Sequence, residues 1–145
     1  MTCKNLLAVS ALCLAPLAAH ADDAADRAAI EAVVQAYFDG IGAADAARLD
    51  KAFAAENAAM VGLVKTRDGG SELKSWKDMS AVVANWAANE GPEGAGRDGE
   101  ILQMTVTDER IAMVMFRYKD EYYDALTLLK VDGAWKIATK TFVER

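Results

Sequence analysis

Asp124 is the residue whose position most strongly suggests chemistry. The segment 122–142 reads as two β-strands joined by Asp132-Gly133, a dipeptide typical of tight hairpin turns. Regular pairing back from this turn places Asp124 opposite Thr141 and, because alternate residues share a face, among apolar side chains: Leu126, Leu128, Trp135 and Ile137. Burial among apolar groups favours the neutral carboxyl, which can donate a hydrogen bond to a ligand oxygen.

The elements that must position Asp124 follow from the periodicity of the chain. Apolar residues at helical spacing predict a helix over 23–40 and a shorter one at about 44–54. A strand over 58–64 and a loop over 66–71 follow, and Ser75 opens a capping-box-like pattern for a third helix. Four strands then form an antiparallel meander: 100–107, 110–118, 121–131 and 134–143. This order predicts an α+β domain whose three N-terminal helices pack on a curved antiparallel sheet and enclose one pocket.

The first 21 residues have the features of a cleaved export signal. Lys4 supplies a positive charge, Leu6 to Leu17 is apolar, and Ala19-His20-Ala21 matches the small-residue cleavage pattern. The apolar stretch is too short for a spanning helix, although an uncleaved membrane anchor is the alternative. We expect cleavage after Ala21, a mature domain over 22–145, and a periplasmic or secreted protein.

The composition excludes several classes of site and partner. Cys3, Cys13 and the only histidine, His20, leave with the signal, so the mature chain can build neither a common zinc site nor a histidine-dependent triad. The net charge of −6 disfavours nucleic acid and anionic membranes. A Gly-x-Gly-x-x-Gly sequence over 94–99 precedes a strand, which is the wrong context for a dinucleotide. We therefore predict no metal, cofactor or nucleic acid, and no membrane contact after cleavage.

The order of elements resembles the nuclear transport factor 2-like superfamily, and in particular its putative lumazine-binding group of small exported proteins. The resemblance rests on Tyr-x-x-Gly at 37–40, on the segment 53–60 and on the hairpin sequence 122–137. Members often carry a His-Pro pair where this chain has Ala54-Ala55, so a functional histidine is excluded there. The resemblance implies a cone-shaped domain with an internal pocket, and homodimers are common in the superfamily.

The chain also resembles the ketosteroid isomerases of the same superfamily. Val33 to Tyr37 is similar to their helix segment that ends in an oxyanion-hole tyrosine, and Asp124 is similar to their protonated aspartic acid. The position of their general base falls at Val61 or Gly62, neither of which can accept a proton. The resemblance therefore implies an oxyanion hole without its base.

Tyr37 and Asp124 are the candidate catalytic or ligand-contacting residues. In the functional interpretation they donate two hydrogen bonds to a ligand oxygen. In the structural interpretation Asp124 instead accepts a hydrogen bond from Thr141, Tyr37 or a backbone N–H, as buried polar groups usually do. Four further residues are expected to line the ligand-binding pocket: Met60, Trp86, Tyr122 and Leu126.

The sequence is compatible with three functions. The first is an exported, non-catalytic binder of a small apolar or aromatic ligand. The second is an isomerase or dehydratase that uses Tyr37 and Asp124 with a base such as Glu56. The third is a protein-interaction module. A homodimer is predicted through the outer face of the sheet, where regular pairing gathers Tyr123, Ala125, Thr127 and Leu129 with Lys136, Ala138, Lys140 and Phe142.

Overall fold

The computed structural model describes residues 17–89, 99–119 and 121–145, with side chains from Asp23 onward. Most of the predicted export signal and most of the predicted glycine-rich loop lie outside these residues. Within them, no helix combines the length and apolar character needed to cross a membrane.

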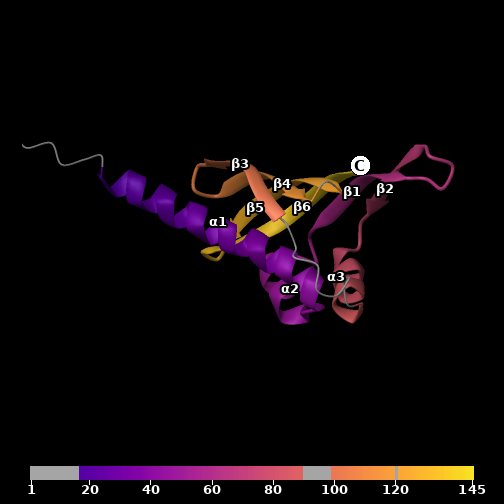
Figure 1. The fold of residues 1–145 in the computed structure, drawn as a ribbon. Coiled ribbons are helices and arrows are strands. Elements are labelled where there is room, and N and C mark those ends of the chain that lie inside the picture. The colour runs from indigo at the N-terminus through magenta and orange to yellow at the C-terminus, as the bar shows by residue number, and fades with distance from the viewer. Residues whose placement is uncertain (1–16, 90–98, 120) are drawn as a thin grey trace, which may run out of the picture.

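Three helices precede the long strands, and they are α1 (Leu17–Ala43), α2 (Ala46–Ala52) and α3 (Met79–Ala88) (Figure 1). The first two include most of the predicted helical segments, although α1 starts before residue 23 and continues past residue 40. The buried residues of α1 recur every three or four positions and form the apolar side that packs on the sheet: Ile30, Val34, Tyr37 and Phe38.

The start of the third helix differs from the prediction. Asp78 caps α3, because its Oδ1 accepts a hydrogen bond of 3.0 Å from the Ala81 N–H. Ser75 lies instead in strand β2 (Ser71–Trp76), where it pairs with Val61. The strand is almost entirely exposed and lies at the edge of the sheet, so it lacks the apolar alternation that would have predicted it.

The sheet has six strands in the order β2-β1-β6-β5-β4-β3. Strand β1 pairs in parallel with β6, and every other pair is antiparallel. The bounds of the remaining strands are β1 (Ala59–Lys65), β3 (Gly99–Thr107), β4 (Ile111–Tyr118), β5 (Tyr122–Val131) and β6 (Ala134–Glu144). The predicted meander is therefore confirmed, and it is extended by a parallel partner and an edge strand.

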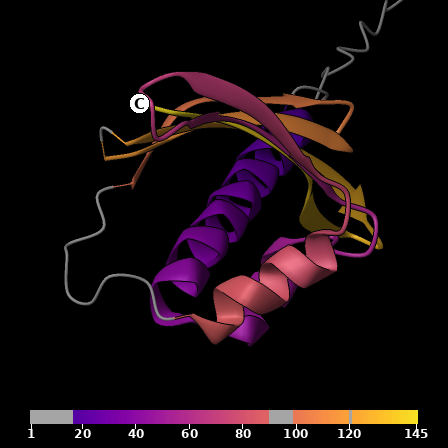
Figure 2. The same cartoon turned by 90° about the vertical axis from the view of Figure 1, so that its right-hand side faces the viewer.

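The sheet is curved, and the helices cover one of its two faces. Figure 2 shows the strands arching over α1, with α3 beside it below the same face. The covered face supplies most of the core, together with α1, α2 and α3. The predicted α+β architecture, with helices packed on a curved sheet, is confirmed.

The register of the β5–β6 hairpin changes at one extra residue. Pairing follows the prediction from the turn to Leu128 and Ile137, but Thr127 then pairs with Thr139, so Ala138 is left over as a β-bulge. Asp124 consequently pairs with Phe142 and not with Thr141. A shift of one residue exchanges the two faces of a strand, so the rest of β6 presents opposite side chains to the core.

Lys140 and Phe142 are the residues that this bulge turns inward. Lys140 is buried and Phe142 packs against the core, whereas Thr139 and Thr141 are exposed. The prediction that Lys140 and Phe142 belong to the outer face is therefore wrong, and its physical cause is the bulge at Ala138.

A buried polar contact joins the N-terminal half of α1 to the β5–β6 hairpin. Asp26 Oδ1 accepts hydrogen bonds from Lys130 Nζ at 2.7 Å and from Trp135 Nε1 at 2.9 Å. These hydrogen bonds, that of Lys130 first, lower the pKa of Asp26 below its ordinary value. The long helix is thus fixed to the sheet by a charged contact in its N-terminal half.

Candidate binding site

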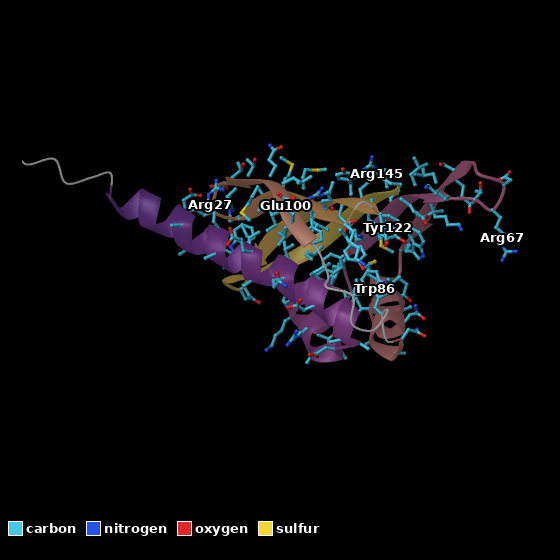
Figure 3. The ribbon with its side chains drawn as sticks, in the orientation of Figure 1. Arg27, Arg67, Trp86, Glu100, Tyr122 and Arg145 are labelled. Atoms are coloured by element: carbon cyan, nitrogen blue, oxygen red, sulfur yellow. The ribbon has the colours of Figure 1, made fainter. Side chains whose placement is uncertain are left out.

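A cavity of about 770 Å³ lies between α1, α3 and the covered face of the sheet. Its volume is typical of sites for small molecules. Figure 3 shows Trp86 on α3 and Tyr122 on β5 extending from opposite sides into the space between helix and sheet. The lining consists of Tyr37, Phe38, Ile41, Met60, Val64, Trp76, Lys77, Asp78, Ala81, Val82, Asn85, Trp86, Phe116, Tyr118, Tyr122, Asp124, Lys140, Phe142 and Glu144.

Aromatic rings from four strands and two helices make up much of the wall. The Tyr118 and Tyr122 rings stack with centroids 6.1 Å apart, and Tyr122 meets the edge of Phe142 at 6.1 Å. On the helical side Tyr37 and Trp86 lie 6.1 Å apart. Flat apolar molecules are the ligands that such walls favour, because rings pack well in offset and edge-to-face contacts.

Phe142 reaches its position only because residue 62 is a glycine. A Cβ atom placed on Gly62 of β1 would lie 2.2 Å from the Phe142 ring, which is closer than non-bonded carbons approach. The ring therefore covers the bare backbone of Gly62 and forms part of the cavity wall. Gly62, one of the two positions at which the isomerase comparison placed the general base, has a packing function here.

Three buried polar side chains meet in the wall of the cavity, each from a different element. Tyr37 of α1 donates a hydrogen bond of 2.8 Å from its hydroxyl to Asp124 Oδ2 of β5. Lys140 of β6 donates one of 2.8 Å to the Tyr37 hydroxyl and forms an ion pair with the same Asp124 oxygen. Tyr37, Asp124 and Lys140 are only 5, 2 and 6 % exposed. We refer to these three residues as the polar cluster.

The polar cluster holds two opposite charges away from water. Burial lowers the pKa of the Lys140 ammonium, and the nearby Asp124 carboxylate opposes this effect. The ammonium also lies 4.8 Å from the centroid of the Phe142 ring and 5.3 Å from that of Tyr37, within the range of cation–π attraction.

The ion pair corrects the expectation of an isolated neutral Asp124. That expectation assumed only apolar neighbours, whereas the bulge brings the Lys140 ammonium into contact with the carboxyl group. The structural interpretation of Asp124 had named three alternative donors, and Tyr37 is the one of them that donates a hydrogen bond to this carboxyl group.

One oxygen of Asp124 has no hydrogen-bond partner within residues 17–89, 99–119 and 121–145. Among the residues that the structure describes, nothing donates to Asp124 Oδ1, although this atom is buried. Buried carboxylate oxygens normally have donors. Because Asp124 lines the cavity, a bound molecule with an N–H or O–H group could supply the donor.

Five of the six predicted pocket residues line the cavity: Tyr37, Met60, Trp86, Tyr122 and Asp124. Leu126 does not, because it lies further along β5 beneath the helices and is fully buried in the core. Lys140 and Phe142 were missed, and no residue type near Ala138 signals the bulge that places them here. Whether these residues contact a ligand remains a prediction.

The proposed base Glu56 is exposed and does not line the cavity, so this part of the isomerase hypothesis is wrong. Two other acids do line it, but each already accepts a backbone N–H. Asp78 caps α3, and Glu144 Oε2 accepts from the Lys65 N–H at 2.9 Å. Burial raises the pKa of Tyr122, with Glu144 and Glu121 acting in the same direction, so this phenol is neutral.

No metal centre is evident in the described parts of the chain, where no three acidic, histidine or cysteine side chains form a group that could hold an ion. The polar cluster contributes an amine, a carboxylate and a phenol to the aromatic wall of the cavity.

Comparison with known families agrees with this fold. A family model described as "Putative lumazine-binding" matches residues 25–143. The chain belongs to this family. The matched region of the putative lumazine-binding family includes all three residues of the polar cluster. No match to a curated protein was found.

Solved structures with the same fold come from several bacteria. A nuclear transport factor 2-like protein of unknown function from Silicibacter pomeroyi DSS-3 is 22% identical, with 85% of this chain and 98% of that chain covered and a TM-score of 0.68. A similar protein of unknown function from Shewanella baltica OS155 is 20% identical, with coverages of 82% and 93% and a TM-score of 0.66.

A third solved structure bears on the isomerase resemblance. A ketosteroid isomerase-like protein from Erwinia carotovora atroseptica SCRI1043 is 18% identical, with 81% of this chain and 94% of that chain covered and a TM-score of 0.54. Identities at this level show the fold alone. The predicted nuclear transport factor 2-like fold of this member of the putative lumazine-binding family is confirmed.

Proposed function

We propose that this protein binds a small, flat and largely apolar molecule that carries a polar edge. The observation that carries the proposal is that Asp124, which lines the aromatic cavity beside Lys140, has one carboxylate oxygen, Oδ1, that no described residue contacts with a hydrogen-bond donor. A ligand N–H or O–H would donate to this oxygen. An ammonium has three N–H groups, and Lys140 uses two of them on Asp124 and Tyr37, so a third is available for a ligand oxygen.

A ring that carries an N–H next to a C=O matches this pair of groups. The N–H would satisfy the carboxylate oxygen, the C=O would accept from the ammonium, and the ring faces would pack on the aromatic walls. Lumazine has such an edge, and the family description supports testing it as one probe of the class. Lumazine methylated on its ring N–H nitrogens is the matched control, because it keeps the shape but lacks the donor.

Binding without catalysis is favoured over an isomerase or dehydratase by the acids around the cavity. Such reactions need a free general base near the substrate. Asp124 is paired with Lys140, and Asp78 and Glu144 are hydrogen-bonded to the backbone. We therefore propose that the polar cluster binds the polar edge of the ligand and does not catalyse a reaction of this kind.

Filling the cavity tests this function. Val82 lines it from α3, so Val82→Trp should reduce the affinity for the flat heterocycle by about tenfold or more, equivalent to about 1.4 kcal/mol. Ala84→Trp on the same helix is the control, because Ala84 is exposed and does not line the cavity. Affinities come from titration calorimetry. Equal binding by the two variants and the wild type would contradict a ligand site in this cavity.

We also propose export of the mature domain, on the composition of the first 21 residues. Protein recovered from the periplasm or medium of a bacterial host should then begin near Asp22. Amino-terminal sequencing measures this directly, and retention of Lys4 in the exported material would contradict cleavage.

Finally, we propose a homodimer through the outer face of the sheet, which is apolar on β4 and β5. Ile111, Met113, Met115 and Leu129 are exposed there. Exposed apolar patches of this kind mark interfaces. Lys140 and Phe142 do not lie on this face, so Lys136 is the only one of the two lysines in the predicted row of β6 residues that remains there. The proposed contact is therefore the part of the face formed by β4 and β5.

Met113→Glu should convert this dimer to a monomer, because it places a charge at the centre of the apolar patch, where Met113 is 61% exposed. Leu73→Glu is the control, since Leu73 is also exposed but lies on the edge strand β2. Sedimentation velocity distinguishes the two states. A wild-type protein that sediments as a monomer at tens of micromolar would refute the dimer.

A further inference from the structure

Lys140 has properties that recognition alone does not require. Its amine lies in the wall of the cavity, is buried, and is flanked by the rings of Phe142 and Tyr37. Burying an ion pair contributes little to stability compared with an apolar pair of the same size. An amine held in this way beside an acid has the surroundings of a lysine nucleophile.

We propose that Lys140 captures apolar aldehydes or ketones inside the cavity as an imine. The proposal rests on the proposed function in one respect, namely that the cavity admits small molecules. The carbonyl carbon would be held at Lys140 Nζ, and the apolar body of the ligand would lie against the aromatic walls. The ligand class is therefore a carbonyl compound attached to a flat or apolar skeleton.

Each proton in the reaction has a donor and an acceptor within the polar cluster. Lys140 first transfers a proton to Asp124 Oδ2, which gives a neutral amine and a carboxylic acid. The nitrogen lone pair then forms a bond to the carbonyl carbon, the C=O π electrons move to oxygen, and a proton moves from nitrogen to that oxygen. The product is a carbinolamine. Its hydroxyl takes the proton back from Asp124 and leaves as water, and the resulting iminium is paired with the Asp124 carboxylate.

The geometry supplies what these steps need. Tyr37 and Asp124 both contact the Lys140 amine, so its protons move along existing contacts. Burial lowers the pKa of Lys140, which raises the neutral fraction above that of an exposed lysine. The Asp124 ion pair acts in the opposite direction. The other ionisable residues that line the cavity are Tyr118, the neutral Tyr122, Lys77, Asp78 and Glu144. Lys140 is only 6 % exposed, which limits the access of bulk water to an imine at its nitrogen.

Reductive trapping on the full-length or mature wild-type protein tests the proposal. Naphthaldehyde is added at pH 7 with cyanoborohydride, which reduces an iminium to a stable secondary amine, and the modified lysine is located by peptide mass spectrometry. We expect modification at Lys140 to be severalfold faster than at Lys77, because the cavity holds the naphthyl ring beside the Lys140 amine and burial lowers the pKa of that ammonium. Lys77 is the matched control because it is an exposed lysine at the rim of the same cavity.

Two further measurements separate this inference from the proposed function. Lys140→Arg keeps the positive charge but cannot form an imine, so it should lose the preferred adduct. Naphthylmethanol has the same skeleton without the carbonyl and reports non-covalent binding alone. If the alcohol binds but the adducts are spread over exposed lysines, the imine is refuted and the binding function stands. If neither compound binds and Lys140 is unmodified, both are refuted.

Discussion

Replacing Lys140 with methionine should lower the free energy of unfolding by about 3–5 kcal/mol. The side chain of methionine fills most of the same space, so the main loss is the ammonium beside Asp124. Asp124 is 2 % exposed and would remain as a buried carboxylate with only the Tyr37 hydroxyl as a donor. An unpaired buried charge costs far more than the ion pair contributes, because the lost hydration of the remaining charge is no longer offset.

The paired variant distinguishes this cause from lost packing. Asp124→Leu with Lys140→Met removes both charges together, so the double variant should regain most of the free energy, about 3–5 kcal/mol, that Lys140→Met loses. Asp124→Asn should also be destabilised, since an amide leaves Lys140 without a counter-charge. Urea unfolding followed by tryptophan fluorescence measures all four proteins. A Lys140→Met variant within about 0.5 kcal/mol of the wild type would show that the pair is not buried as the structure places it.

Replacing Asp26, which lies in the N-terminal half of α1, should produce the second large loss of stability. Asp26→Ala leaves Trp135 Nε1 and Lys130 Nζ without their acceptor, and hydrogen bonds to a charged group contribute about 1.5–3 kcal/mol each. Since Lys130 is partly exposed and can turn to water, we expect a total of about 2–3 kcal/mol. Asp23→Ala is the control, because its ion pair with Arg27 on the same helix is exposed and should contribute less than about 1 kcal/mol.

The effect of Asp26 should depend on pH in a defined direction. Its hydrogen bonds, mainly that from Lys130, lower the pKa from the ordinary value of 3.8 in the folded protein. The folded state then binds fewer protons than the unfolded state, so the contribution to stability is complete above the ordinary pKa and is lost as the pH falls through the lowered one. The difference between wild type and Asp26→Ala should therefore be constant near neutral pH and shrink under acid conditions. A difference that instead grows as the pH falls would contradict the ion pair.

Local patterns were sufficient to predict most of the fold and part of the site. The Asp132-Gly133 turn correctly determined the pairing as far as Leu128 and Ile137, because turn geometry sets the register of a hairpin over the first few residues. Helical spacing predicted α1 and therefore the inward side of Tyr37. The alternation along β5 predicted the inward side of Asp124, which depends only on residues within that strand.

The sequence was less informative where a residue depends on partners far along the chain. Strand β2 is exposed, so it carries no apolar signal and exists because β1 offers it an edge. The position of Lys140 depends on the bulge at Ala138, a residue whose type neither demands nor forbids one. A single extra residue reverses the two faces of β6, and packing of the whole sheet against α1 decides where that residue falls. The inward positions of Asp124 and Tyr37 could thus be predicted from the sequence, whereas the position of the Lys140 ammonium beside them was decided only by the tertiary structure.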